Sequence, residues 1–360
     1  MKFKHPYKFG KGYEKSVAYF SMEFAIDQPL KIYSGGLGFL AGSHMRSAYD
    51  LKQNMVGIGI LWKYGYYDQG RKHNNELDAL WQERHYNFLE DTGLELEVNV
   101  NHHPVKVKVF YLAPDVFGSA PMFLLSTDHP ENDHLAQTIT HKLYDNNIST
   151  RIAQYILLGI GGAKLLEAIN HNVEQYHFNE AHALPAAFRL MEKLGDIEKV
   201  KEQLVFTTHT PVKAGNEVND PYMLHNMGFF NGFSIQEVEE MVGFENGMFN
   251  HTLAALRMSK VSNAVSKKHC EVSKEMWGGF DGICDIIPIT NAQNKAYWTD
   301  SELEKSHAKK DDKKFLKRKV ELKKELFKLV ADQTGKILDP NVLTIVWARR
   351  FAGYKRADLI

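Results

Sequence analysis

The chain has 360 residues, longer than a typical single domain, and its 44% hydrophobic and 24% charged residues are typical of a soluble globular protein. Forty-four basic residues balance forty-four acidic ones, so no net charge attracts the chain to nucleic acid or to a membrane surface. Two cysteines are too few for a disulfide framework, and no apolar run approaches the ~20 residues of a membrane span, so we expect a soluble, cytoplasmic protein.

A glycine-rich turn between a strand and a helix is the first distinctive feature of the chain. Residues 17–20 form an apolar run typical of a buried strand. Gly35, Gly36 and Gly38 then precede a segment with apolar residues at helical spacing. This layout brings backbone N–H groups to a helix N-terminus, where the helix dipole favours an anion such as phosphate. A plain strand-to-helix connection explains the same residues about as well.

Three further strand segments follow. Residues 55–62 form a second apolar run, residues 94–112 alternate as a half-buried hairpin does, and residues 121–125 are apolar again. The loop over residues 128–134 contains two histidines and three carboxylates, but it lacks the fixed spacing of a metal site. We therefore expect a solvated loop and no metal there.

Two strand ends in the middle of the chain carry the candidate site residues. From the helix expected over residues 151–168, helices alternate with strands, which indicates a mostly parallel α/β sheet with ligands beyond its carboxyl ends. Glu180, His182 and His209 lie where two of these strands should end. An isolated histidine is more often a core or surface residue, but here each strand end supplies one within a polar cluster. His177 and His182 are five positions apart, which argues against a zinc helix.

The last third of the chain is expected to contain a helix over residues 259–276, a strand over 284–291 and a charged helix over 303–329. The lysines of the charged helix suggest a nucleic-acid surface, but the solvated face of a neutral protein explains them better. Residues 341–347 form another apolar run typical of a buried strand. The predicted domains are residues 1–292, a linker with the charged helix over 293–340, and the first strand and turn of a second domain over 341–360.

Seven short motifs occur in order along the chain: Ser21-Met-Glu-Phe24, Gly35-Gly-Leu-Gly38, Tyr66-Tyr-Asp-Gln69, Asn179-Glu-Ala-His182, Thr208-His-Thr210, Thr290-Asn291 and Arg349-Arg-Phe-Ala-Gly-Tyr-Lys355. In this order they resemble the motifs of the glycogen, starch and maltodextrin phosphorylases, in particular the short bacterial α-glucan phosphorylases. The resemblance extends from about Val17 to the last residue. One such motif is weak evidence of a relationship, whereas seven in order are strong evidence.

The resemblance implies an α/β chain of GT-B architecture, with an N-terminal Rossmann-like domain and the beginning of a second, truncated Rossmann-like domain. It implies a glycosyltransferase of carbohydrate metabolism that uses inorganic phosphate to release glucose 1-phosphate from the end of an α-1,4-glucan, with retention. Pyridoxal 5'-phosphate is the family's cofactor, and its phosphate group serves as proton donor and acceptor. The expected partners are an α-glucan (maltodextrin or glycogen) and phosphate, without nucleic acid or membrane. A homo-oligomer is compatible with the resemblance, and allosteric regulation is left open.

The resemblance assigns phosphate binding to two parts of the chain. Gly35 and Gly36 would face the phosphates as cofactor-binding residues, in agreement with the anion site inferred from the turn. Arg350 and Lys355 would act as catalytic residues that bind substrate phosphate and cofactor phosphate. A guanidinium fork and a lysine point charge suit that role.

Sugar binding is assigned to other residues. His209 would lie at the reacting glucose as a catalytic and substrate-binding residue, near the hydroxymethyl side of the sugar. Asn291 would hydrogen-bond the same sugar. Asn179, Glu180 and His182 would line the cleft in supporting roles.

The chain also departs from the family pattern. Ala25 stands where many members have a tyrosine beside the cofactor, and Asn291 is followed by Ala-Gln-Asn-Lys in place of the usual run. The family's Schiff-base lysine and the acidic residue that binds the glucose 3-hydroxyl lie beyond the motif of Lys355, and this chain contains neither. We therefore expect a fragment of such an enzyme that has no turnover by itself.

Two alternative functions stay open. A glycogen or starch synthase-like glucosyltransferase shares the GT-B architecture and the Gly-Gly-Leu-Gly turn, but it normally has a lysine two residues before the turn, where this chain has Tyr33. A non-catalytic glucan-binding domain would keep the cleft without cofactor binding or phosphorolysis.

Overall fold

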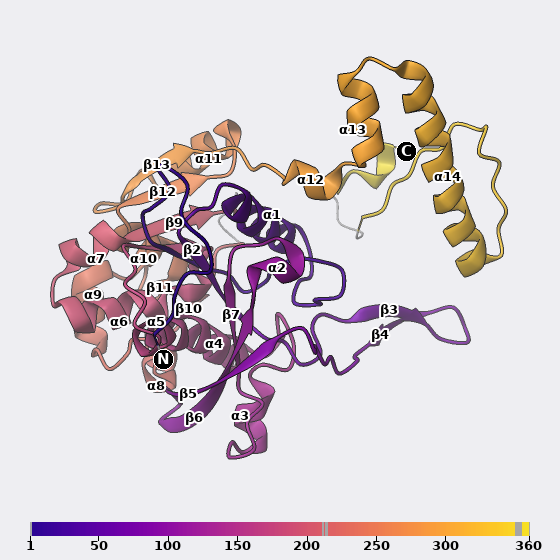
Figure 1. Cartoon of the computed structure of the whole chain (residues 1–360). Helices are drawn as coiled ribbons and strands as arrows, with labels where there is room; N and C mark the ends of the chain where they lie inside the picture. Colours follow the sequence, from indigo (N-terminus) through magenta and orange to yellow (C-terminus); the bar gives the residue numbers. More distant parts are fainter. Residues whose placement is uncertain (1, 211, 213–214, 350–354, 360) are drawn as a thin grey trace. The chain divides into compact units, whose positions relative to one another are not determined.

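The computed structural model of the chain describes residues 2–210, 212, 215–349 and 355–359 (Figure 1). The chain divides into two compact units, Met1–Asn294 and Lys295–Ile360, and each unit is described by itself. In the described part of the chain, no helix has both the length and the apolar character that crossing a membrane requires.

The first unit is built on a nine-stranded sheet with the order β13-β12-β9-β8-β1-β2-β7-β6-β5. The strands from β13 to β7 are parallel, and β6 and β5 extend the sheet as an antiparallel hairpin. The bounds are β1 (Val17–Phe20), β2 (Met55–Ile60), β5 (Glu90–Val100), β6 (His103–Leu112), β7 (Met122–Ser126), β8 (Gln175–Asn179), β9 (Leu204–Thr208), β12 (Val261–Ala264) and β13 (Asp285–Pro288). The predicted α/β class with a large, mostly parallel sheet is confirmed.

Two short antiparallel pairs lie outside this sheet. They are β3 (Asp68–Arg71) with β4 (Leu77–Leu80), and β10 (Val218–Asn219) with β11 (Phe249–Asn250). Figure 1 shows β3 and β4 as a hairpin that projects from the sheet.

Helices cover both faces of the sheet. Gly57 and Ile58 are neighbours on β2, so their side-chain positions face opposite sides. A Cβ on Gly57 would lie 2.8 Å from Met45 of α1, whereas a Cβ on Gly162 of α5 would lie 2.7 Å from Ile58. Helix α1 therefore covers one face and α5 the other. The helices of this unit are α1 (Gly36–Asp50), α2 (Pro114–Phe117), α3 (His134–Thr138), α4 (Ile148–Ile156), the π-helical turn η1 (Leu157–Gly161), α5 (Gly162–Ala168), the 3₁₀ turn η2 (Ala181–Ala183), α6 (Pro185–Leu194), α7 (Ile197–Gln203), α8 (Pro221–Met227), α9 (Ile235–Val242), α10 (His251–Met258) and α11 (Lys267–Trp277).

The helix predicted over residues 259–276 is wrong in its first part. Val261–Ala264 forms strand β12, which pairs in parallel with β9 on one side and β13 on the other. The helix α11 begins only after Ser266, whose side chain accepts a hydrogen bond from the backbone N–H of His269. Four residues between two existing strands gain a ladder of hydrogen bonds on both sides, and this non-local pairing outweighs the local helical pattern.

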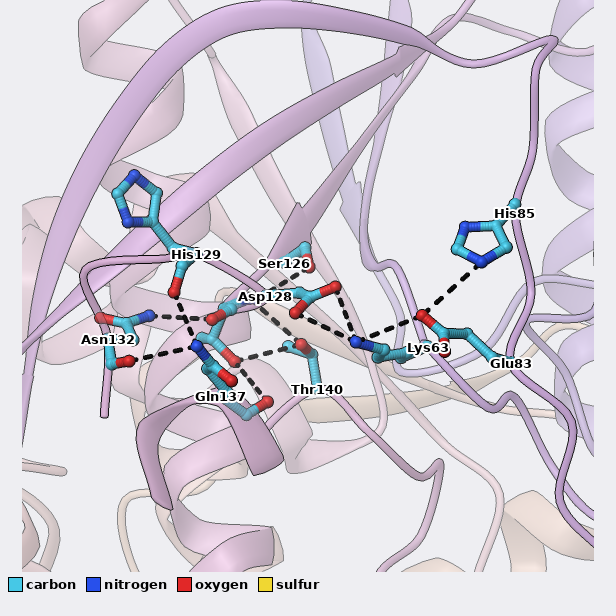
Figure 2. Close-up of polar contacts among 10 residues, drawn as sticks. Lys63, Glu83, His85, Ser126, Asp128, His129, Asn132, Gln137 and Thr140 are labelled. Carbon is cyan, nitrogen blue, oxygen red and sulfur yellow. Dashed lines mark hydrogen bonds and ion pairs between the residues drawn. The ribbon is translucent and has the colours of Figure 1, made fainter. Parts of the chain in front are cut away.

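The polar loop after β7 is held by hydrogen bonds within the chain (Figure 2). Asp128 forms an ion pair with Lys63 at 3.1 Å, and Lys63 also contacts Glu83 at 3.3 Å. The Asn132 amide donates to two backbone carbonyl groups, and the Asp133 side chain caps α3. The loop residues thus connect β7 to its surroundings, which accounts for their polarity.

The second unit contains three helices in its described residues, α12 (Lys295–Trp298), α13 (Ser301–Ala308) and α14 (Asp312–Thr334), followed by the short 3₁₀ turn η5 (Ala357–Leu359). The Arg318 guanidinium of α14 binds Asp300 at 2.9 Å and contacts further carboxylates on both helices. Two lysines of the predicted charged helix, Lys314 and Lys317, also lie near carboxylates of the same unit, Asp311 and Glu321.

The strand expected over residues 341–347 is not formed in this structure. Residues 343–349 have no assigned secondary structure, and the side chains of Leu343 and Ile345 are 85% and 73% exposed. A strand requires a neighbouring strand to accept its N–H groups, and none pairs with this segment among the described residues. The boundary between the two compact units, after Asn294, lies close to the predicted boundary at residue 292. The assignment of three separate domains stays a prediction.

Candidate functional site

Between β1 and β8, the order of the strands in the sheet reverses relative to their order in the chain. Strands β2 and β7 follow β1 on one side, whereas β9, β12 and β13 follow β8 on the other. Such a switch point opens a crevice at the carboxyl ends of the two central strands, where open α/β sheets bind their ligands. The structure contains a cavity of about 270 Å³ at this place, lined mainly by Tyr144, Tyr155, Glu180, His182, His209 and Glu217.

The glycine turn before α1 lies beside a buried carboxylate. Glu23, only 2% exposed, accepts hydrogen bonds from the backbone N–H groups of Ser34 at 2.7 Å and Gly35 at 3.1 Å. A Cβ on Gly38 would lie 2.7 Å from Oε2 of Glu23, so glycine is required there for this close approach. The N–H group of Gly35, which the sequence assigned to an external anion, therefore binds a carboxylate of the chain itself, as does that of Ser34.

The other glycines of the turn are not required by packing. A Cβ on Gly35 or Gly36 would meet no atom within 4 Å, and Leu37 reaches the cavity. The backbone of this turn thus borders open space. That geometry is compatible with a ligand near Gly36, but the neighbouring Glu23 charge opposes an anion at the same place.

Asn179 connects the ends of β1, β8 and β9. Its side chain is buried, 1% exposed, and its Nδ2 donates to the Ser21 hydroxyl at 3.0 Å. Its Oδ1 contacts Nε2 of His209 at 2.7 Å. Asn179 therefore contacts the ring of His209, which lines the cavity, but Asn179 itself is not among the lining residues.

Glu180 holds the segment after β9. Its backbone has the left-handed φ of 65°, which is uncommon for a residue other than glycine and costs of order 1 kcal/mol or more. This conformation turns the carboxylate toward the next strand, where Oε1 accepts hydrogen bonds from the N–H of His209 at 2.7 Å and the hydroxyl of Thr210 at 3.1 Å. Burial of the carboxyl group raises the pKa of Glu180 to about 7, although both hydrogen bonds oppose the rise.

A second carboxylate, Glu217, lies across the cavity. It accepts a hydrogen bond from the Tyr155 hydroxyl at 2.8 Å and forms an ion pair with Arg151 at 3.2 Å. Burial by itself would raise the pKa of Glu217, but His251, Tyr155 and Arg151 hold it below its ordinary value. Glu217 is therefore ionised near neutral pH, and its charge is compensated by Arg151.

The two tyrosines of the cavity are hydrogen-bond donors. Tyr144 donates to Glu23 at 2.8 Å and Tyr155 donates to Glu217. The pKa of each is raised well above the ordinary value, chiefly by burial and then by the neighbouring carboxylate. Both hydroxyl groups therefore stay protonated.

The histidines of the cavity are neutral. Burial lowers the pKa of His182, His209 and His251 to about 4 in each case. Buried ring atoms without a hydrogen-bond partner in the described structure include Nδ1 of His182 and Nδ1 of His251. The described lining residues of the cavity thus present neutral imidazoles and carboxylate oxygens, and Arg151, which pairs with Glu217, is not among them. This set of acceptors suits the hydroxyl groups of a neutral ligand better than a phosphate.

The remaining predicted site residues are Asn291, Arg350 and Lys355. Asn291 is exposed beyond β13, where its backbone N–H donates to the carbonyl of Val265 at 2.9 Å, and it does not line the cavity. Arg350 lies outside the described residues. Lys355 belongs to the second unit. The first unit by itself therefore brings together Glu180, His182 and His209, the three residues predicted from strand ends.

Sequence reasoning missed several residues of this site: Glu23, Tyr144, Tyr155, Glu217 and His251. For Glu23 a signal existed, because it follows the buried strand β1 as Glu180 follows β8. The other four come from helices and loops far apart in the sequence. Only the fold places them at the cavity.

Similarity to known proteins was found along nearly the whole chain, although no family model matches it. An uncharacterized protein of Methanocaldococcus jannaschii is 49% identical over 346 residues, which cover 96% of this chain and 66% of that protein. The maltodextrin phosphorylase of Thermococcus litoralis is 34% identical, covering 97% of this chain and 48% of the relative. The glycogen phosphorylase of Aquifex aeolicus is 29% identical, with 98% and 60% covered. The chain thus spans between about half and two thirds of the length of these relatives.

Proposed function

Because the chain is related to the glycogen and maltodextrin phosphorylase family over most of its length, we propose that it forms the sugar-binding part of an α-1,4-glucan phosphorylase. The proposed reaction is phosphorolysis of the terminal glucose of maltodextrin or glycogen, which yields glucose 1-phosphate with retention. Since the chain spans about half the length of the maltodextrin phosphorylase relative, the complete reaction is proposed for the full-length protein.

The observation that carries this proposal is the chemistry of the cavity at the β1/β8 switch point. Its acceptors are the carboxyl oxygens of Glu180 and Glu217 and three uncharged imidazoles, whereas the two tyrosine hydroxyls already donate to Glu23 and Glu217. A neutral polyhydroxylated ligand can donate hydrogen bonds to these acceptors. A glucose unit at the end of a glucan has this chemistry.

The proposed roles follow from this geometry and from the family resemblance. His209 would bind the hydroxymethyl side of the reacting glucose. Glu180 and His182 would contact the sugar from the same end of the sheet, and Asn291 would approach it from the loop after β13. Asn179 would hold the ring of His209 through the contact between its Oδ1 and Nε2 of the histidine.

Phosphate would be bound by Arg350 and Lys355, whereas the predicted role of Gly35 and Gly36 is disfavoured because the Gly35 N–H already binds Glu23. The cavity of the first unit does not fit a phosphate group by itself, because its described lining residues include no arginine or lysine and because Glu23 occupies part of the turn. Pyridoxal 5'-phosphate, the cofactor implied by the resemblance, is therefore proposed only for a site that includes residues beyond this cavity, and no step is derived through it.

Binding of a glucan to the chain tests the sugar site directly. Isothermal titration with maltoheptaose, without phosphate or cofactor, should show binding that is lost in a His209→Ala variant. An exposed histidine that lies outside the cavity, His73, provides the control, and His73→Ala should bind as the unchanged protein does. Absence of maltoheptaose binding to the folded chain would contradict the proposed sugar site.

Release of glucose 1-phosphate from maltoheptaose and phosphate by the full-length protein tests the reaction. Binding without this release would favour a glucan-binding domain instead. Transfer from a sugar nucleotide would favour a synthase-like glucosyltransferase.

A further inference from the structure

A row of buried polar groups connects the end of β1 to the ring of His209. The Ser21 hydroxyl lies 2.9 Å from the backbone carbonyl of Glu23, and the Asn179 Nδ2 lies 3.0 Å from the Ser21 hydroxyl. The Asn179 Oδ1 lies 2.7 Å from Nε2 of His209. Ser21 and Asn179 are 0% and 1% exposed, so water does not compete for these contacts.

The direction of each hydrogen bond in this row is determined by the first one. A carbonyl oxygen only accepts, so the Ser21 hydroxyl must donate its single hydrogen to the Glu23 carbonyl. The Ser21 oxygen then accepts from Asn179, which must point its NH₂ group toward Ser21 and its Oδ1 toward His209. An amide oxygen also only accepts, so Nε2 of His209 must carry a hydrogen.

We infer that Ser21 and Asn179 are positioning residues that hold His209 in the Nε2–H tautomer, so that its Nδ1 lone pair faces the cavity and accepts a hydrogen bond from a ligand hydroxyl. The identity of that ligand as a sugar rests on the proposed function. The assignment of the tautomer does not. Asn179, predicted to bind substrate, acts instead through His209.

The surroundings keep this ring uncharged. Burial lowers the pKa of His209 to about 4, and the neighbouring His269 of α11 and His182 of η2 lower it further if they are charged. The Glu180 carboxylate binds the backbone N–H of His209 and not its ring. In the described part of the chain, Nδ1 has no hydrogen-bond partner, and His209 lines the cavity. The ring therefore offers a neutral acceptor.

A neutral acceptor selects among ligands. A hydroxyl group can donate to Nδ1, whereas a fully ionised phosphate has only acceptor oxygens and is repelled by the lone pair. The row of Ser21 and Asn179 thus biases this point of the cavity toward a hydroxyl and away from an anion.

The ¹⁵N resonances of the histidine rings in the folded chain test the inference, with His209→Gln to identify the signal. Near neutral pH, the expected spectrum shows His209 with a protonated Nε2 and an unprotonated Nδ1. Ser21→Ala frees the Asn179 amide to turn its NH₂ group toward His209, so a mixture of both tautomers is expected. Asn179→Asp places a carboxylate beside Nε2, so the pKa of His209 should rise and both ring nitrogens should become protonated at a higher pH than in the unchanged protein.

Ser262→Ala is the matched control. Ser262 is a buried serine of β12 whose hydroxyl has no hydrogen-bond partner in the described structure, and its replacement should leave the His209 signal unchanged. An Nδ1–H tautomer in the unchanged protein would overturn the inference. So would an unaltered His209 signal in folded Ser21→Ala and Asn179→Asp variants.

Maltoheptaose affinity separates the two proposals. Loss of one neutral hydrogen bond should weaken binding about threefold to tenfold in Asn179→Asp and leave Ser262→Ala unaffected. If His209 has the expected tautomer but neither the unchanged protein nor any variant binds maltoheptaose, the result supports the positioning role of Ser21 and Asn179 and contradicts the proposed sugar site. If maltoheptaose binds normally to Asn179→Asp although its His209 is protonated, the ligand does not use Nδ1 as an acceptor.

Discussion

Two carboxylates of the cavity should affect stability in opposite directions as pH changes. The folded-state pKa of Glu180 is raised from 4.5 to about 7 by burial, whereas that of Glu217 is lowered. A raised pKa means that Glu180 stabilises the fold fully below pH 4.5 and that this stability is lost as pH rises through about 7. At about 1.4 kcal/mol per pH unit, the loss amounts to about 3 kcal/mol at most.

The variant Glu180→Gln isolates this effect. Its amide oxygen can still accept from the N–H of His209 and from Thr210, but it does not ionise. Urea unfolding at about pH 5 and about pH 8 should show that the unchanged protein loses about 2–3 kcal/mol more than the variant over this interval. Other titrating groups contribute equally to both proteins and cancel in the difference.

Glu217→Gln provides the matched control from the same cavity. A lowered pKa means that Glu217 stabilises the fold above its unfolded-state pKa and that this stability is lost as pH falls through the folded-state value. Both states are ionised between about pH 5 and about pH 8, so the cost of Glu217→Gln should be nearly constant over that interval. If Glu180→Gln and the unchanged protein show the same pH dependence, the electrostatic account of the cavity is wrong.

Three other predictions concern the glycine turn, the phosphate motif and the second unit. Glu23→Ala removes the acceptor of two backbone N–H groups and a tyrosine hydroxyl and should lower the free energy of unfolding by about 3 kcal/mol or more. Glu23→Gln should cost about 1 kcal/mol, because its amide oxygen can accept from both N–H groups and its NH₂ group can donate to the oxygen of Tyr144. If both variants lower the free energy of unfolding in urea by the same amount, the hydrogen bonds accepted by Glu23 do not account for the loss of stability. In the proposed full-length phosphorylase, Arg350→Ala should weaken apparent phosphate affinity about tenfold to a hundredfold, and Lys355→Ala should additionally reduce retention of the proposed cofactor, while glucan affinity changes little. Unchanged phosphate kinetics in a cofactor-loaded Arg350→Ala variant would remove this motif from the site. Limited proteolysis of the chain should cleave between residues 292 and 339 and leave a stable core; protection of residues 341–349 equal to that of β9 would contradict the predicted boundary.

The sequence by itself determined most strands of the sheet and three members of the site. The apolar run over residues 17–20 coincides with β1, because a strand buried on both faces needs an unbroken apolar segment and this requirement is local. Glu180, His182 and His209 can be grouped from their positions along the chain alone, since parallel strands present their carboxyl ends at one edge. The relationship to the phosphorylases was also contained in the order of the motifs, and the comparisons confirm it.

Only the tertiary structure decided what these groups bind. The sequence shows that Glu23 follows a buried strand, but it does not show the contact of Glu23 with the glycine turn, which changes an expected anion site into one that already holds a carboxylate. Tyr155, Glu217 and His251 meet although many residues separate them. The strand β12 replaces part of an expected helix because two neighbouring strands accept it. In each case the deciding interaction joins residues that are not neighbours in the chain, and burial strengthens it by removing water, so neither spacing nor composition could have shown it.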